Sequence, residues 1–218
     1  MVSRLRLFAE REQYVVHLRG GLWVDVLARW SRAALIVSLL MFAIAPRFVP
    51  ETYSIVENTL SESGAQGTQG AWVFRAGVLL AACSVSLMAV STRQGWSPAA
   101  RRWMRFYGLA LVMLMVFPEA PPDGGAYDET TATLHTAFAA SGGASFILGV
   151  IAVSLSRARH DFWFRSLDWV VVAAVVVIPQ VMLVTGVDGL LQRIMVGLGY
   201  IWLLSEAGRA AKPERSAL

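Results

Sequence analysis

The side chains of this sequence that could do chemistry lie in the connections between long apolar segments. His135 could act as a general base or proton carrier, because the charge of a histidine changes close to neutral pH. Ser61 could serve as a nucleophile and Glu62 as an acid, so a Ser61–His135–acid arrangement would suit acyl or phosphoryl transfer. The alternative for His135 is a hydrogen-bonded packing residue near the end of a helix.

Four more polar residues fall in or beside the same connections and could bind a substrate. Arg75 and Arg193 could hold an anionic group through charge-assisted hydrogen bonds. Glu119 and Gln192 could line the same pocket. We expect Arg75 to pair with a carboxylate, Glu62 or Glu119, and such a pair would mainly fix loops on the helices. A binding pocket and a set of structural ion pairs are therefore both open interpretations.

Metal and cofactor chemistry is not indicated. A zinc site needs several histidine or cysteine ligands, but His17, His135, His160 and Cys83 fall in segments that cannot converge. No glycine-rich phosphate loop or dinucleotide fingerprint is present. The sequence therefore predicts no cofactor and no resident metal, with a carboxylate-only calcium site in the connections as an alternative.

The elements that must position these residues are apolar helices. The chain has 218 residues, of which 56% are hydrophobic and 16% charged, and its mean hydropathy is +0.54. An ordinary soluble domain carries about 25% charged residues, so this composition indicates an all-α membrane protein. A helix needs about 20 apolar residues to cross a bilayer, and six segments meet that length. The six expected spans of this transmembrane bundle are residues 31–49, 71–91, 103–118, 133–155, 167–187 and 190–207.

The basic residues predict the orientation of the bundle. All Lys and Arg residues except Arg47, Arg75 and Arg193 fall on one side of the expected spans. By the positive-inside rule, both termini are cytoplasmic and the protein lies in the cytoplasmic (inner) membrane. This topology accounts for the net charge of +4, so no nucleic-acid partner is expected.

Three regions and two kinds of partner follow from this arrangement. Residues 1–30 form a basic amphipathic helix on the cytoplasmic face, residues 31–207 the transmembrane domain and residues 208–218 a cytoplasmic tail. Membrane lipids are the expected partners, and a membrane protein could dock on residues 1–30 or on small-residue helix faces. Tryptophans near the span ends are expected to form an aromatic belt, among them Trp96 and Trp202.

Short motifs in a fixed order carry a resemblance to a known family. Ser61-Glu62-Ser63-Gly64 precedes the second span, Phe117-Pro118 ends the third, His135 opens the fourth, and Gly189-Leu190-Leu191-Gln192-Arg193 opens the sixth. This order resembles the domain of unknown function 998 family of six-span bacterial and archaeal membrane proteins, over about residues 30–207. Gln192 departs from the family pattern, in which an acidic residue is more usual, and this weakens an acid role there. The family has no established activity, so the resemblance implies fold and location.

Two hypotheses of function follow. In the first, a polar pocket at the outer mouth binds or modifies a lipid head group, with His135 as the base and Ser61 or a water as the nucleophile. A weak likeness to other six-span families linked to lipid handling points the same way. In the second, the protein is a non-catalytic accessory subunit of a larger membrane complex. A transporter is less favoured, because no inverted repeat is found.

Overall fold

The chain folds into helices joined by two long and several short connections. The structure is a computed structural model that describes the backbone of residues 26–91, 95–157 and 162–210. Within these ranges the helices are the first helix (residues 26–44), α2 (Ala71–Ser91), α3 (Pro98–Val116), α4 (Glu129–Ser156), α5 (Phe162–Thr185) and α6 (Asp188–Ala210). Two 3-10 turns, η1 (Ala45–Arg47) and η2 (Ser61–Gly64), lie in the connection after the first helix. No strand occurs in the described ranges, so the prediction of an all-α fold is confirmed.

Some predicted boundaries need correction. The α2 boundaries agree with the prediction, but α3 and α4 begin several residues before the expected starts at 103 and 133. The reason is capping: the Ser97 hydroxyl accepts a hydrogen bond from Ala100 N, and the Asp128 carboxylate accepts one from Thr131 N at 2.6 Å. A search for apolar residues does not register these polar first turns. Most of the proposed amphipathic helix at residues 1–30, and most of the tail, lie outside the described residues.

Among the residues that the structure describes, four helices are long and apolar enough to cross a membrane, as expected of an integral membrane protein. The four segments are Val26–Arg47, Ala71–Ser91, Glu129–Ser156 and Arg165–Thr185. The other two helices are more polar: α3 carries three arginines in its first eight residues, and α6 carries both acidic and basic side chains.

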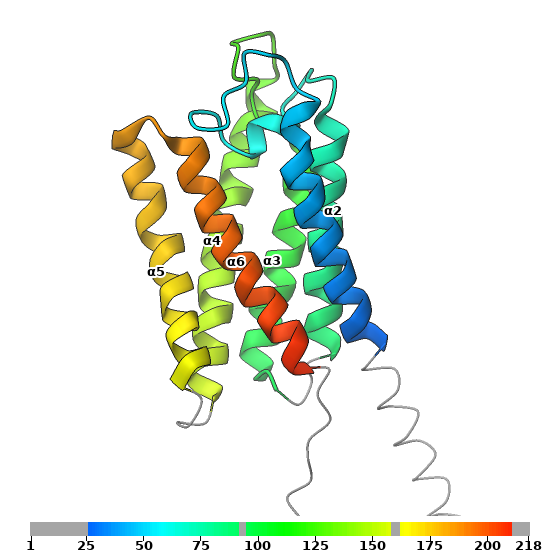
Figure 1. Cartoon of the computed structure of the whole chain (residues 1–218), viewed down its shortest axis with the longest axis vertical. Coiled ribbons are helices and arrows are strands. Elements are labelled where there is room, and N and C mark those ends of the chain that lie inside the picture. The colour runs from blue at the N-terminus through cyan, green and yellow to red at the C-terminus, as the bar shows by residue number, and fades with distance from the viewer. Residues whose placement is uncertain (1–25, 92–94, 158–161, 211–218) are drawn as a thin grey trace, which may run out of the picture.

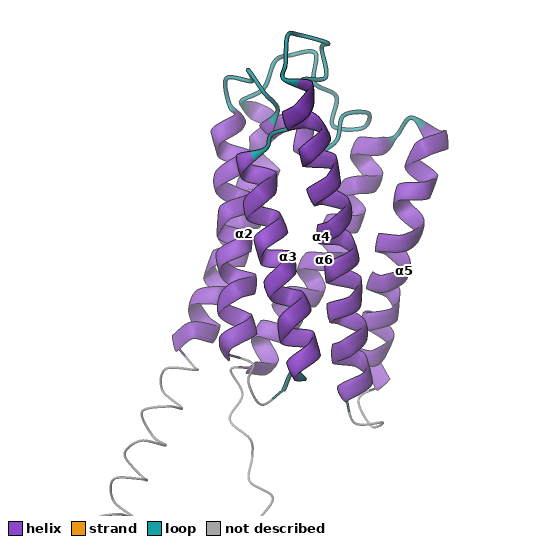
Figure 2. Ribbon diagram, turned by 180° about the vertical axis from the view of Figure 1, so that it is seen from behind, coloured by secondary structure: helices purple, strands orange, loops and turns teal. Residues whose placement is uncertain are grey.

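The helices run alongside one another, and the long connections gather at one end (Figures 1 and 2). We call this end, with connections 48–70 and 117–128, the loop end. The first helix starts and α6 finishes at the opposite end (Figure 1). Helix α5 lies at an edge of the bundle and packs mainly on α6 and α4.

The core is rich in aromatic side chains. Trp202 is fully buried, and its ring lies edge-on to Phe146 and stacks with Trp96 at a centroid distance of 5.9 Å. The prediction that Trp96 and Trp202 belong to an interfacial belt is therefore wrong. Their indole N–H groups bind buried carboxylates, which explains why such amphipathic rings can lie inside the protein.

Candidate functional site

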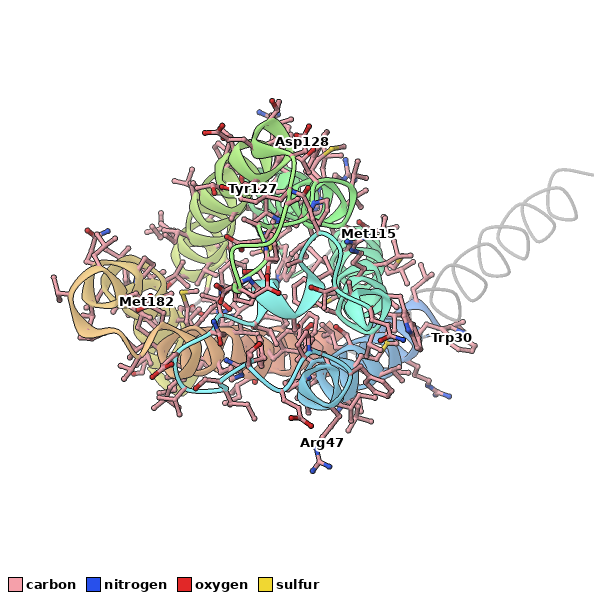
Figure 3. The ribbon with its side chains drawn as sticks, turned by 90° about the horizontal axis from the view of Figure 1, so that it is seen from above. Trp30, Arg47, Met115, Tyr127, Asp128 and Met182 are labelled. Atoms are coloured by element: carbon pink, nitrogen blue, oxygen red, sulfur yellow. The ribbon has the colours of Figure 1, made fainter. Side chains whose placement is uncertain are left out.

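The predicted site residues lie at the loop end, where the two long connections are joined to each other and to the helices. Seen from above, connection 48–70 lies across the end of the bundle (Figure 3). Gln66 joins it to connection 117–128, because its backbone N–H donates to Glu119 O at 2.9 Å and its side chain bonds Pro118 O and both backbone groups of Asp128. These bonds hold the two long connections together over the end of the bundle.

Ser61, Glu119 and His135 meet in one hydrogen-bonded chain. The Ser61 hydroxyl on η2 donates to Glu119 Oε2 at 2.6 Å, and His135 Nε2 on α4 lies 3.2 Å from the same oxygen. The order is therefore serine–carboxylate–imidazole, with Glu119 in the middle. Ser61 is not hydrogen-bonded to His135, as the predicted serine–histidine arrangement would require.

His135 is held between two acceptors. Its Nδ1 lies 2.8 Å from the carbonyl oxygen of Phe117, and its Nε2 faces the Glu119 carboxylate. A carbonyl and a carboxylate both accept hydrogen bonds, so an imidazolium satisfies the two contacts together. The His135 side chain is only 5% exposed, whereas that of Glu119 is 31% exposed, so Glu119 is the member of the pair that solvent or a ligand reaches.

The surroundings of Glu119 stabilise its charged form. Burial alone would raise the pKa of this carboxyl, but the hydrogen bonds from His135 and Ser61 outweigh burial and lower it. Both of these bonds go to Oε2. Glu119 Oε1 makes no hydrogen bond within the described part of the chain, so it can accept one from a hydroxyl or amine.

Glu62 lies close by but is engaged differently. Its Oε2 accepts a hydrogen bond from the backbone N–H of Thr59, which closes the turn that leads into η2. Burial raises the pKa of Glu62 above its ordinary value, and the charge of nearby Glu119 adds to the effect. Glu62 also lines a cavity of about 20 Å³ between the two connections, which has room for about one water molecule.

Arg75 does not pair with a carboxylate. Its Nε and Nη2 both donate to the carbonyl oxygen of Gly64 at 3.2 Å, and Nη2 also approaches Ala65 O at 3.4 Å. The expected partners Glu62 and Glu119 are therefore wrong. The physical reason is that the last carbonyls of a helical turn lack partners within it, and Arg75 supplies donors at that point.

Gln192 and Arg193 fasten connection 48–70 to α6. The Gln192 side-chain oxygen accepts a hydrogen bond from the backbone N–H of Leu60. This contact needs an acceptor but no charge, so a neutral amide is sufficient at this position. Arg193 donates to several oxygens of the connection and of its own helix, namely Ile55 O at 2.9 Å, Asn58 O at 2.9 Å, Gly189 O at 2.8 Å and the Tyr53 hydroxyl. Burial raises the pKa of Tyr53 despite the neighbouring arginine charge, so its hydroxyl stays protonated near neutral pH.

Two motif glycines allow this close packing. A Cβ on Gly64 would overlap the ring of Phe74, and a Cβ on Gly189 would overlap the carbonyl oxygens of Ile55 and Asn58. The Ser61–Gly64 turn of connection 48–70 therefore packs closely on α2, and the start of α6 packs closely on an earlier part of the same connection.

The site residues thus form two groups. Ser61, Glu119 and His135 converge, while Arg75, Gln192 and Arg193 hold backbone groups of the loop. Within the described residues, no set of three or more His, Cys, Asp or Glu side chains could hold a metal ion. The arrangement can bind a hydrogen-bond donor at Glu119 and move a proton between Glu119 and His135.

A second polar cluster, at the opposite end of the bundle, was not predicted. Arg157, at the end of α4, donates to both oxygens of Asp168 at 2.6 and 2.8 Å and to Glu206 Oε1. Trp202 and Trp96 donate to Asp168 and Glu206 at 2.7 and 2.8 Å. All three charged side chains are at most 4% exposed. The signal in the sequence was the two carboxylates inside apolar segments, since buried charges require partners.

Comparison with known proteins gives the family of the chain and no more. No curated protein matches it, and no solved structure does. The family model described as a protein of unknown function, DUF998, matches residues 32–207, a range that contains the motif residues of both long connections and of α6. The chain belongs to the DUF998 family.

Proposed function

We propose that this protein is a six-span protein of the cytoplasmic membrane that binds a lipid head group at the loop end. The observation that carries the proposal is the geometry of Glu119. One oxygen of this carboxylate is fixed by Ser61 and His135, while Oε1 makes no hydrogen bond in the described residues and the side chain is 31% exposed. A fixed, charged acceptor at the end of an apolar bundle suits a head group that donates hydrogen bonds.

The six-span topology rests on where the polar residues of α3 and α6 lie. The arginines of α3 fall in its first turns, and Glu206 and Arg209 fall in the last turns of α6. Both sets lie at the end opposite the loops, where α3 begins and α6 finishes (Figure 1), and charged residues are tolerated better near the end of a span than at its centre. The remaining parts of α3 and α6 are mainly apolar, which supports a crossing of both helices beside the other four. Positive-inside orientation places this end, and both termini, in the cytoplasm.

The proposed ligand carries a hydroxyl or amine next to its phosphate. The guanidinium N–H groups of Arg75 and Arg193 already donate to backbone carbonyls. An anionic group would therefore have to displace these hydrogen bonds to bind either arginine. Glu119 instead accepts from a neutral hydroxyl or an ammonium group. In an enzymatic form of this function, His135 and Glu119 would exchange a proton with the head group, and Ser61 would first have to leave Glu119.

Lipid binding to the purified chain tests this function. Native mass spectrometry would compare lipids of equal chain length with ethanolamine, glycerol or choline head groups. We expect retention of the first two and weaker retention of choline, which has no N–H or O–H donor. Glu119→Gln should reduce this preference, and Glu51→Gln, the same change at an exposed carboxylate of connection 48–70, should leave it unchanged. Equal binding of all three head groups, or no effect of Glu119→Gln, would contradict the proposal.

A non-catalytic accessory role is the second candidate. Two features of the loop end favour it: the cavity between the connections has a volume of only about 20 Å³, and Arg75 and Arg193 are already hydrogen-bonded to backbone oxygens. For this role, extraction in mild detergent should yield the protein in a stable complex with a different membrane protein. A chain that is purified alone under these conditions would count against it.

A further inference from the structure

Helix α5 carries an exposed face with an unusual residue at its centre. Residues 169, 173, 176, 180 and 183 follow one another at alternating spacings of four and three, and all five are exposed: Trp169, Ala173, Val176, Gln180 and Leu183. This is the spacing of the contact positions in a helix pair. We call these five residues the α5 face.

Gln180 is the only polar side chain on the α5 face. Its amide makes no hydrogen bond within the described residues, although Pro179 beside it leaves the carbonyl of Val175 without its usual helical donor. The segment Arg165–Thr185 spans about 31 Å at 1.5 Å per residue, which matches the apolar thickness of a bilayer. Gln180 lies five residues, or about 7.5 Å, from the end of this segment, too deep for its short side chain to reach water.

Lipid alone does not satisfy this amide. Acyl chains offer neither a donor nor an acceptor, and a polar group left without a partner in hydrocarbon is costly. The surrounding residues of the α5 face are apolar, and the position of α5 at an edge of the bundle leaves them accessible from the membrane (Figure 3, where Met182 marks this helix). A polar residue at one contact position, flanked by apolar ones, is the pattern that fixes register and partner number in helix pairs.

We propose that a second copy of this chain packs on the α5 face, with the two Gln180 side chains hydrogen-bonded to each other. A carboxamide contains both a donor and an acceptor, so two of them across a two-fold axis satisfy one another. Two copies inserted in the same orientation are related by such an axis along the membrane normal. Ala173, about two turns before Gln180, is small enough to let the two helices approach each other closely. This dimer does not depend on the head-group site at the loop end.

Association of the full chain in phosphatidylcholine vesicles tests the proposal. Energy transfer between labelled copies, measured over a range of protein-to-lipid ratios, gives the dissociation constant. We expect Gln180→Leu to raise this constant about tenfold, which corresponds to about 1.4 kcal/mol, and Gln180→Asn to change it less than threefold. A Gln180→Leu variant that dimerises like the unmodified chain would overturn the proposal.

Disulfide cross-linking provides an independent geometric test. In a Cys83→Ala background, Leu183→Cys should cross-link to itself on oxidation in membranes. Leu109→Cys is the matched control, because Leu109 is also an exposed leucine, but on α3. Equal cross-linking of the two variants would show random collisions and refute the dimer. The dimer would also be refuted if the unmodified chain co-purified with a different protein and the Gln180→Leu variant did not. The partner on the α5 face would then be that protein and not a second copy.

Discussion

Removing Arg157 should strongly destabilise the protein. Arg157 supplies donors to three carboxylate oxygens, and the side chains of Asp168 and Glu206 are 1% and 4% exposed. Arg157→Met keeps much of the side-chain volume but leaves two buried carboxylates facing each other without a positive charge between them. Breaking a buried pair in this way costs about 3–5 kcal/mol. We therefore expect the free energy of unfolding to fall by about this amount.

Unfolding in mixed micelles with increasing dodecyl sulfate measures this change, and tryptophan fluorescence reports on it directly because Trp96 and Trp202 contact the cluster. The matched control is the triple variant Arg157→Met, Asp168→Asn, Glu206→Gln. Its amide oxygens still accept from both indoles, so it should recover at least half of the loss. A single variant that loses less than about 1 kcal/mol, or a triple variant no more stable than the single one, would refute this reasoning.

Three further predictions concern the loop end. Arg193→Met removes the donors that hold connection 48–70, so limited proteolysis should cut this connection at least tenfold faster, whereas Arg47→Met, at an outward-pointing arginine, should have no effect (Figure 3). Because the pKa of folded Glu119 lies below its ordinary value of 4.5, this residue contributes stability that is present above that pH and lost as the pH falls through the folded pKa. The stability difference between the unmodified chain and Glu119→Gln, followed by thermal unfolding from pH 7 to pH 3, should therefore narrow on acidification. Gly70→Ala places a Cβ against the backbone of Phe48 and should lower the unfolding free energy by about 1–3 kcal/mol in the same micelle assay, and an unchanged value would contradict the packing described here.

The sequence was most informative about features that follow from residue type alone, such as the apolar character of the helices. Apolar length predicted the helices, and the family motifs pointed to the end of the bundle where Ser61 and His135 both contact Glu119. The sequence did not predict the order of the three hydrogen-bonded side chains, in which Glu119 lies between Ser61 and His135. That order depends on the path of connection 117–128, in which three residues bind Gln66, and no local periodicity specifies this path.

The arginines show a second limit. A charged side chain near a span end suggests a carboxylate partner, but Arg75 and Arg193 bind backbone carbonyls that become accessible only once the connection has folded into turns. Asp168 and Glu206 present the opposite case. Their partner is a charged side chain, since both carboxylates lie within apolar segments and are buried against Arg157.

The two polar clusters differ in one respect that bears on function. At the end opposite the loops, each of the four carboxylate oxygens of Asp168 and Glu206 has a donor, and the side chains are almost fully buried. The burial of this cluster leaves a ligand no access to these oxygens, so the cluster acts on stability and helix placement. At the loop end, Glu119 is held in position through one oxygen while the other has no donor in the described residues. A fixed acceptor that is still open to a donor is what a binding site requires, so Glu119 is the residue on which tests of function should begin.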